Sequence, residues 1–273
     1  LRHDLRDVLE RASARESAAR VAAGAIAKLF LARFGVEIKS GVRSLGAVGT
    51  DRPTPTWSDL EAVDDGSPLR AVHRDLEDEM VALVDRMKDE GDSLGGSVTV
   101  IAHNVPPGLG SYVQWDEKLD GRLARAVMSV PAVKAVEIGA AIAASGGPGS
   151  AAHDPIGWSQ VDRWTRASNR AGGLEGGVTN GEDVVITAFK KPISTLLRGL
   201  PSVDLDTMEA RTSQYERSDV TALPAAGVIA EAMVAVELAD TLLVKLGGDS
   251  MTEVEAHWRV TIEQQQRWPT PAR

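Results

Sequence analysis

Residues 224–246 read PAAGVIAEAMVAVELADTLLVKL, and a pair of glycines follows them. The segment is apolar almost all round, with few charged residues to mark a face in contact with water. A helix of this kind is buried, because none of its faces is suited to solvent. The sequence therefore predicts a long central helix that ends at the glycine pair and against which the other elements pack.

Weaker helix and strand patterns surround this segment. Helical spacing or composition is found in 1–9, 17–34, 76–87, 116–128 and 249–268, and short apolar or alternating strands are found in 36–42, 98–102 and 184–189. The order of these elements shows no strict β-α-β repeat, and neither a phosphate loop nor a dinucleotide-binding glycine motif is present. We expect an α+β fold, as one large domain or two small ones.

Two stretches rich in glycine, proline and small polar residues are expected to be loops. They cover 46–68 and 143–162, and much of the second is expected to be mobile. The proline-rich end of the chain, 268–273, is expected to be disordered.

The composition limits the classes of function. The net charge is −9 with acidic and basic residues interspersed, which argues against a nucleic-acid surface because that needs a clustered basic face. The absence of cysteine excludes disulfides, thiolate zinc sites and thiol nucleophiles. The five histidines lack metal-ligand spacing, so no metal site is predicted. No apolar run could span a bilayer and no signal peptide is recognisable, so we expect a cytoplasmic protein without a membrane partner.

Glycines are concentrated in Asn169–Gly181, just before the strand at 184–189. Glycine lets the backbone approach a ligand closely, and a cation and several hydroxyls follow downstream, which favours an anion-binding site. A flexible surface loop is the alternative, and glycine content alone leaves both interpretations open.

Three short groups could provide the polar side chains of such a site. Arg11 and Arg15 lie one helical turn apart with a serine between them, as in an anion site, or they are surface arginines matched by neighbouring glutamates. Residues 191–195 place a lysine and two hydroxyls at a strand exit, or form an ordinary turn. Asp219, two residues after Arg217, is a salt-bridge partner or helix cap, or a carboxylate that accepts a proton from carbon once it is desolvated.

Taken together, the motifs resemble those of chorismate synthases, in the same order along almost the whole chain. The matching segments are Arg11–Glu16 (R-[AS]-S-A-R-E), Gly91–Gly96 (G-D-[ST]-x-G-G), Asn169–Gly181 (N-x-A-G-G-[IL]-x-G-G-x-[ST]-x-G), Lys191–Thr195 (K-P-[IT]-x-[ST]), Arg217–Asp219 (R-x-D) and Gly247–Ser250 (G-G-D-S). One explanation covers all of them, whereas each alone has an ordinary alternative. The resemblance therefore favours the functional interpretation of each group.

This resemblance implies a single chorismate synthase-like domain over residues 1–273, with a β-α-β sandwich around a buried helical layer. It implies a metal-free lyase of the shikimate pathway that converts 5-enolpyruvylshikimate 3-phosphate to chorismate by 1,4-anti elimination of phosphate and a ring proton. Reduced FMN is required in the family although no net redox change occurs, and NADPH is an implied reductant. Family members form homotetramers.

The resemblance also assigns site residues position by position. The implied cofactor contacts are Arg11, Ala12, Ser13, Pro131, Ala132, Gly176, Lys191, Pro192, Ile193, Ser194, Thr195 and Arg217. Arg15 and Arg217 are the implied partners of the substrate's phosphate or carboxylates, because a guanidinium binds such anions through two parallel hydrogen bonds. Asp219 matches the family's acidic residue near flavin N5, to which help in removing the ring proton is ascribed. Thr221 stands where the family often has cysteine.

Two family motifs, G-E-S-H-G and P-G-H-A-D, are absent from the sequence. In the family their histidines act as a catalytic acid near the substrate phosphate and as a proton donor to the flavin, and His3 corresponds to neither. We expect the chain to be part of a longer enzyme that carries these histidines upstream, and to be inactive by itself. The alternative is a truncated homologue that binds flavin or a phosphorylated ligand, or assembles with another chain, without catalysis.

Overall fold

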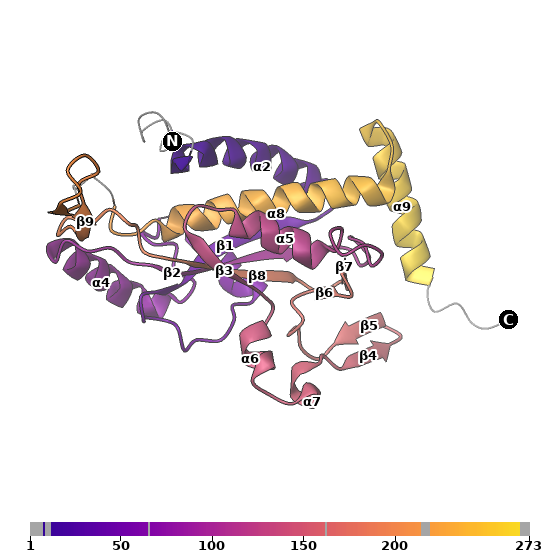
Figure 1. Cartoon of the computed structure of the whole chain (residues 1–273). Helices are drawn as coiled ribbons and strands as arrows, with labels where there is room; N and C mark the ends of the chain where they lie inside the picture. The colour runs from indigo at the N-terminus through magenta and orange to yellow at the C-terminus, as the bar shows by residue number, and fades with distance from the viewer. Residues whose placement is uncertain (1–7, 9–11, 65, 162, 214–218, 268–273) are drawn as a thin grey trace.

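The structure is a computed structural model of the chain, and it describes residue 8 and residues 12–64, 66–161, 163–213 and 219–267. In this part of the chain, the long central helices pack on one face of an antiparallel sheet (Figure 1). The sheet has four strands in the order β1-β2-β8-β3. Their bounds are Glu37–Leu45, Gly96–His103, Val184–Lys190 and Val133–Ile138. The expectation of an α+β fold is confirmed.

The predicted central helix is α8, Leu223–Leu246, which ends at the glycine pair. It packs against β1 and β2 and against two further helices, α2 (Ser17–Ala32) and α5 (Leu119–Met128). Gly24 of α2 faces Ala232 of α8 so closely that a Cβ on Gly24 would lie 2.3 Å from the Cβ of Ala232. The missing side chain at Gly24 is therefore what allows the two helices to approach.

Smaller elements surround this core. The helices are η1 (Ala14–Glu16), α3 (Trp57–Glu61), η2 (Arg74–Leu76), α4 (Glu77–Asp89), α6 (Ala141–Ser145), α7 (Gly149–Ala152) and α9 (Met251–Arg267). The two-stranded ribbons are β4–β5 (Ile156–Ser159, Arg163–Arg166), β6–β7 (Leu174–Glu175, Val178–Thr179) and β9–β10 (Pro201–Val203, Ala210–Thr212). The two stretches expected to be loops thus contain short elements as well, α3 in the first and α7 and β4 in the second. The expected helix at 1–9 and the tail at 268–273 lie outside the described residues, apart from Val8.

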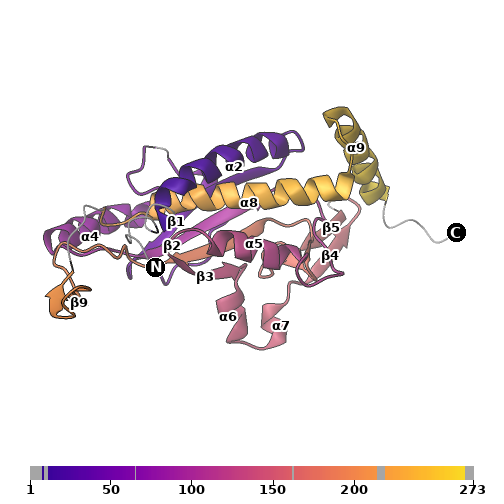
Figure 2. The same ribbon diagram turned by 45° about the horizontal axis from the view of Figure 1, so that its top comes forward.

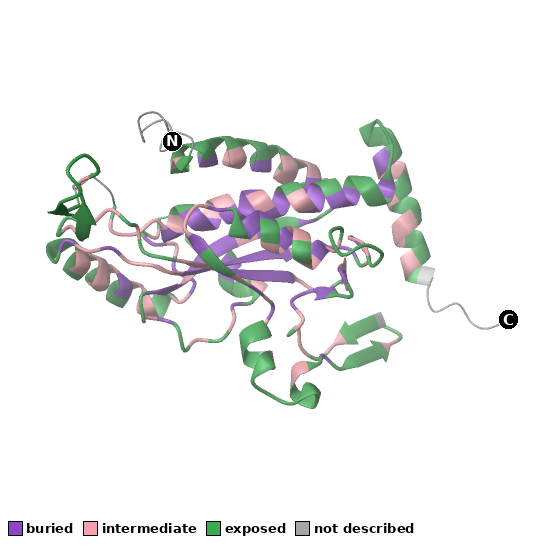
Figure 3. Ribbon diagram, in the orientation of Figure 1, coloured by how far each residue is buried: buried purple, intermediate pink, exposed green. Residues whose placement is uncertain are grey.

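The buried residues concentrate in the sheet and on α8, whereas the outward side of α2 is exposed (Figure 3). Ile26 and Leu29 on that side are 71% and 73% exposed. In the described residues, a four-stranded sheet packs on one side of the helical layer. The expected sandwich has two such sheets, and the described residues contain one of them. No helix in the described ranges is long and apolar enough to cross a bilayer.

Candidate functional site

Three strand ends meet at one end of the sheet. β8 ends at Lys190, which pairs both with Gly96, at the start of β2, and with Val133, at the start of β3. A Cβ at Gly95 would lie 2.4 Å from the carbonyl oxygen of Lys190, so only glycine allows this close passage. Burial, and then the neighbouring Lys191, lower the pKa of Lys190. Two lysines in succession at a strand exit therefore concentrate positive charge at this end of the sheet.

The structure brings two of the predicted cofactor contacts together here, although they are far apart in the sequence. The backbone N–H of Lys191 donates to the carbonyl oxygen of Ala132 at 2.9 Å. Ala132 adopts a φ of 68°, in the left-handed region that residues with a side chain rarely occupy. Such a conformation costs about 1–3 kcal/mol, and outliers of this kind cluster at active sites and ligand clamps. Pro131 and Ala132 are thus placed beside the exit of β8.

The G-D-S-L-G-G segment, residues 91–96, joins this corner to the Asp219 region. The hydroxyl of Ser93 donates to the carbonyl oxygen of Ile193 at 2.6 Å, and the N–H of Leu94 donates to the carbonyl oxygen of Val220 at 2.8 Å. Since Val220 follows Asp219 directly, this one segment holds both predicted groups in place.

A cleft of about 720 Å³ opens between α4, the turn before β2, the segment after β8 and the start of α8. Its walls are formed by Val84, Lys88, Asp89, Gly91, Asp92, Thr195, Leu197, Asp219, Val220 and Thr221. The volume is within the range of small-molecule sites. Thr195 and Asp219, both predicted site residues, line this same cleft. The hydroxyl of Thr221 is buried and has no hydrogen-bond partner among the described residues, a state that costs about 1–3 kcal/mol and calls for an explanation.

The start of α2 lies at the same end of the molecule as α4, the β9 ribbon and the start of α8 (Figure 2). The hydroxyl of Ser13 accepts a hydrogen bond from the N–H of Arg15 at 3.3 Å and so caps the first helical turn. Glu16 forms its salt bridge with Arg20 at 2.8 Å, and Arg20 also donates to the hydroxyl of Ser129 at 2.7 Å, just before Pro131. Ser13 and Arg15 are thereby held at the end of the molecule where Ala132 and Lys191 meet.

Two predicted arginines cannot be placed in this way. Arg11 and Arg217 lie outside the described residues. Ala12 and Arg15 are exposed, and so are Asp219 and Lys191. The predicted residues that the structure does describe are therefore exposed or partly exposed, and none of them is buried in the core.

Much of the glycine-rich stretch packs closely against neighbouring backbone. Gly172, Gly173 and Gly177 are buried. A Cβ at Gly172 would lie 2.4 Å from the N atom of Gly139, and one at Gly173 would lie 2.4 Å from the carbonyl oxygen of Asp183. These glycines let backbone pack directly on backbone against the ends of β3 and β8.

Gly176 is the open member of this stretch, because a Cβ added to it would meet no atom within 4 Å, and its φ is 63°. It lies in the turn between β6 and β7, at the start of β8 rather than at its exit (Figure 1). The seven residues of β8 separate the two ends by roughly 20 Å at the usual rise of a strand. Within one copy, the structure does not bring Gly176 to the group at Lys191 and Ala132.

Asp154 is a structural residue that the sequence does not identify, because it lies in a stretch rich in glycine and serine. It is 8% exposed. Its carboxylate accepts from the hydroxyl of Ser168 at 2.5 Å and from the N–H groups of Arg170 and Ala171 at 2.8 and 2.9 Å. Burial by itself raises the pKa of Asp154, but these hydrogen bonds outweigh it and hold the pKa below its ordinary value. Asp154 thus anchors the chain where the glycine-rich stretch begins.

We expect Asp154→Asn to lower the free energy of unfolding by about 2–3 kcal/mol, because one backbone N–H would then face an amide donor in a buried position. Urea unfolding measures the loss, and faster hydrogen exchange at residues 170–173 locates it. The matched control is Asp204→Asn, which removes a similar carboxylate that accepts from the N–H groups of Asp206 and Thr207 in a solvated turn. Equal losses in the two variants would contradict the assignment.

The same carboxylate predicts a dependence on pH. Because its pKa is lowered in the folded chain, its contribution is present above the ordinary value of 3.8 and is lost as the pH falls through the folded value. Protection of residues 170–173 from hydrogen exchange should therefore weaken below about pH 3.8 in the unaltered chain. In Asp154→Asn this additional acid-induced loss should be absent.

Comparisons with known proteins point to one family. The family model described as chorismate synthase matches residues 1–243. A chorismate synthase from Saccharopolyspora erythraea is 54% identical over 251 residues, which are 91% of this chain and 62% of that protein. One from Geobacter sulfurreducens is 48% identical over 267 residues, which are 95% of this chain and 68% of that protein.

A solved structure described as a crystal structure of chorismate synthase superposes with a TM-score of 0.84 at 41% identity, covering 98% of this chain and 74% of that one. The chain thus spans roughly two thirds of the length of the relatives that it matches, 62% of the first and 68% of the second. The motifs at the strand exit and the cleft fall within the matched residues. The chain therefore belongs to the chorismate synthase family.

Proposed function

We propose that this chain is part of a chorismate synthase that eliminates phosphate and a ring proton from 5-enolpyruvylshikimate 3-phosphate. The observation that carries the proposal is the convergence of Ala132, Lys191–Thr195 and Asp219 around one corner and its cleft. These segments are distant in the sequence and match family motifs in family order. Membership of the family supplies the class of reaction, carbon–oxygen lysis in the shikimate pathway.

The residues present fit the flavin phosphate that such an enzyme uses. The cleft of about 720 Å³ has room for part of a cofactor, and its wall contains two of the predicted site residues, Thr195 and Asp219. Lys191, Ser194 and Thr195 supply a cation and two hydroxyls beside the strained backbone of Ala132. When bound, reduced FMN lends electron density to the substrate and recovers it, so that the reaction involves no net redox change.

The chain's own residues then have distinct roles. Arg15 and Arg217 hold the substrate's phosphate or carboxylates through paired hydrogen bonds. Ser13 and Ala12 present the short helix η1, which precedes α2, to the cofactor, together with Arg11. Asp219 takes the proton that leaves the ring carbon. As an exposed carboxylate it is a weak base in water, and substrate and cofactor raise its basicity when they cover it.

The family resemblance also supports an assembly. We propose a homotetramer in which the segment upstream of residue 1 completes the sandwich over the exposed side of α2. Because Gly176 is at the far end of β8, it can contact the flavin only of a neighbouring copy. NADPH is proposed as a reductant, and chemical reduction of FMN with dithionite in a parallel assay separates this role from the lyase reaction.

Flavin binding by the chain tests the site directly. Lys191→Glu should weaken FMN binding about tenfold to a hundredfold, since a charge-assisted contact to phosphate is replaced by repulsion. Titration followed by flavin fluorescence measures the dissociation constant. Lys134→Glu, an equal charge change at an exposed position of β3, is the matched control and should bind as the unaltered chain does. Equal affinities in the two variants, or no binding by the unaltered chain, would contradict the site.

A flavin-binding homologue without catalysis is the alternative candidate. Both candidates predict the same binding of FMN. They differ in turnover by a protein in which the upstream histidine segment is restored.

A further inference from the structure

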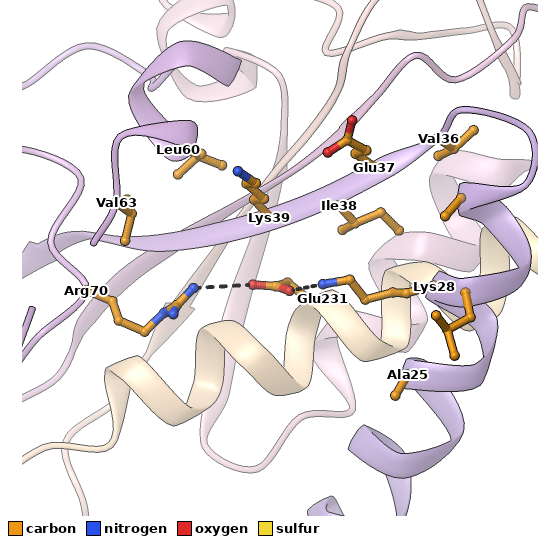
Figure 4. Close-up of a pocket in the computed structure, with 12 residues that line it drawn as sticks. Ala25, Lys28, Val36, Glu37, Ile38, Lys39, Leu60, Val63, Arg70 and Glu231 are labelled. Carbon is orange, nitrogen blue, oxygen red and sulfur yellow. Dashed lines mark hydrogen bonds and ion pairs between the residues drawn. The ribbon is translucent and has the colours of Figure 1, made fainter. Parts of the chain in front are cut away.

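A groove of about 690 Å³ runs along the outer edge of β1, on the side of the molecule opposite β3 (Figure 4). Leu29 of α2 and Leu60 of α3 contribute apolar surface to its walls. At its base Glu231 of α8 is buried and binds Lys28 at 2.6 Å and the hydroxyl of Ser40 at 2.6 Å. The groove thus has an apolar wall on each side and an ion pair that is already satisfied, which favours an extended chain over a small charged ligand.

The edge of β1 is covered only near its end. At Val42, the N–H donates to the carbonyl oxygen of Arg70 and the carbonyl oxygen accepts from the N–H of Val72, both at 2.9 Å. The backbone groups of an antiparallel strand alternate between its two sides. The N–H and carbonyl groups of Ser40, Ile38 and Val36 therefore point to the same edge as those of Val42. Their partners must be sought on the open side.

Two of these edge groups have partners. The N–H of Val36 donates to the carbonyl oxygen of Leu31 at 3.3 Å, and the carbonyl oxygen of Ser40 accepts from the guanidinium of Arg70 at 3.3 Å. Within the described residues, no backbone partner is found for the carbonyl oxygen of Val36, for the N–H and carbonyl oxygen of Ile38, or for the N–H of Ser40. An open strand edge of this kind is a template for pairing with another chain.

The four remaining groups are complementary to themselves. In an antiparallel pair centred on Ile38, the two copies of Ile38 exchange two hydrogen bonds. The N–H of each Ser40 then donates to the carbonyl oxygen of Val36 in the other copy, which makes four bonds in all. The N–H of Val36 and the carbonyl oxygen of Ser40 already have partners, and they face each other across this pair. No free donor or acceptor is therefore left opposite an occupied group. No other register about a two-fold axis uses all four free groups.

The side chains between these residues agree with the same register. With Ile38 opposite its copy, Glu37 lies opposite Lys39 in both halves of the pair. Opposite charges directly across an antiparallel pair are favourable, and like charges are unfavourable.

We propose that a second copy of this chain docks on this edge, so that the two β1 strands pair antiparallel about a two-fold axis and form one sheet of eight strands, four from each copy. A self-complementary patch of this kind is what a two-fold interface requires. The inference concerns the association of copies and does not rest on the catalytic proposal.

Charge reversal tests the register. Sedimentation equilibrium of the unaltered chain should show dimers or larger assemblies at micromolar concentration. Lys39→Glu places two glutamate pairs across the interface and should raise the dissociation constant about tenfold to a hundredfold, as should Glu37→Lys with two lysine pairs. An equimolar mixture of the two variants restores opposite charges at every position and should associate as a heterodimer. Lys134→Glu on β3, at the other edge of the sheet, should leave association unchanged.

Disulfide trapping provides a readout that does not depend on affinity. The chain has no cysteine, so introduced cysteines have no competitors. A mixture of Glu37→Cys and Lys39→Cys chains should form a mixed disulfide under mild oxidation, because directly opposed residues at such a non-hydrogen-bonded position have Cα atoms about 4.5 Å apart. Each variant alone should form it much more slowly. A monomeric unaltered chain, or an assembly indifferent to both charge reversals and without the mixed disulfide, would overturn the proposal.

Discussion

The purified chain, given 5-enolpyruvylshikimate 3-phosphate and reduced FMN without oxygen, is expected to release no phosphate. The reason is chemical. The cleft contains carboxylates, hydroxyls and a lysine, but of the histidines in the described residues none lines it. The family resemblance implies histidines that protonate the leaving phosphate and the flavin, and the motifs that would carry them are not in this sequence.

Activity should appear when the missing groups are supplied. A fusion in which the upstream segment of the Saccharopolyspora erythraea relative precedes residue 1 is a suitable partner, since the shared 251 residues are 54% identical. Chorismate is followed by its absorbance and phosphate by a coupled assay. The same fusion with its two motif histidines changed to alanine is the control and should bind substrate without turnover. Turnover by the chain alone would contradict the expectation, and an inactive fusion that binds FMN would favour the non-catalytic homologue.

In the active fusion, Asp219→Asn should lower kcat about a hundredfold to ten thousandfold, the range that a positioned general base contributes. KM and the affinity for FMN should change little, because the amide preserves the size of the side chain and removes only its basicity. Stopped-flow absorbance under anaerobic conditions measures the rate of chorismate formation.

Asp89→Asn is the matched control for this substitution. Asp89 lines the same cleft from the end of α4 and undergoes the same loss of charge. If the two variants lost activity equally, the effect would come from the net charge of the cleft and not from proton transfer by Asp219. A kcat that stays within a few fold of the unaltered fusion would remove Asp219 from the mechanism.

The sheet strands and the long helices could be predicted from the sequence because each has a local cause. The apolar run at 224–246 leaves a helix no exposed face, and alternation at 36–42 allows one face of a strand to be buried. Leu223–Leu246 and Glu37–Leu45 are accordingly a helix and a strand in the structure. The site motifs, Lys191–Thr195 and Arg217–Asp219, were recognisable for a different reason, their specific residue types in family order.

The tertiary structure decided what the glycines do and which motifs meet. Glycine content is compatible with an open site, a mobile loop or close backbone packing, and only the proximity of Gly139 and Asp183 shows that Gly172 and Gly173 serve packing. Asp154 acquires its role from donors that the folded chain brings around it.

Separation in the sequence also differs from separation in space. Gly176 and Lys191 are near in sequence and lie at opposite ends of β8, whereas Ala132 and Lys191 are far apart in sequence and share a hydrogen bond of 2.9 Å. Patterns along a chain report the environment of each residue, because burial and helix geometry act locally. Contacts between distant segments follow from the pairing order of the sheet, β1-β2-β8-β3, which no local pattern contains.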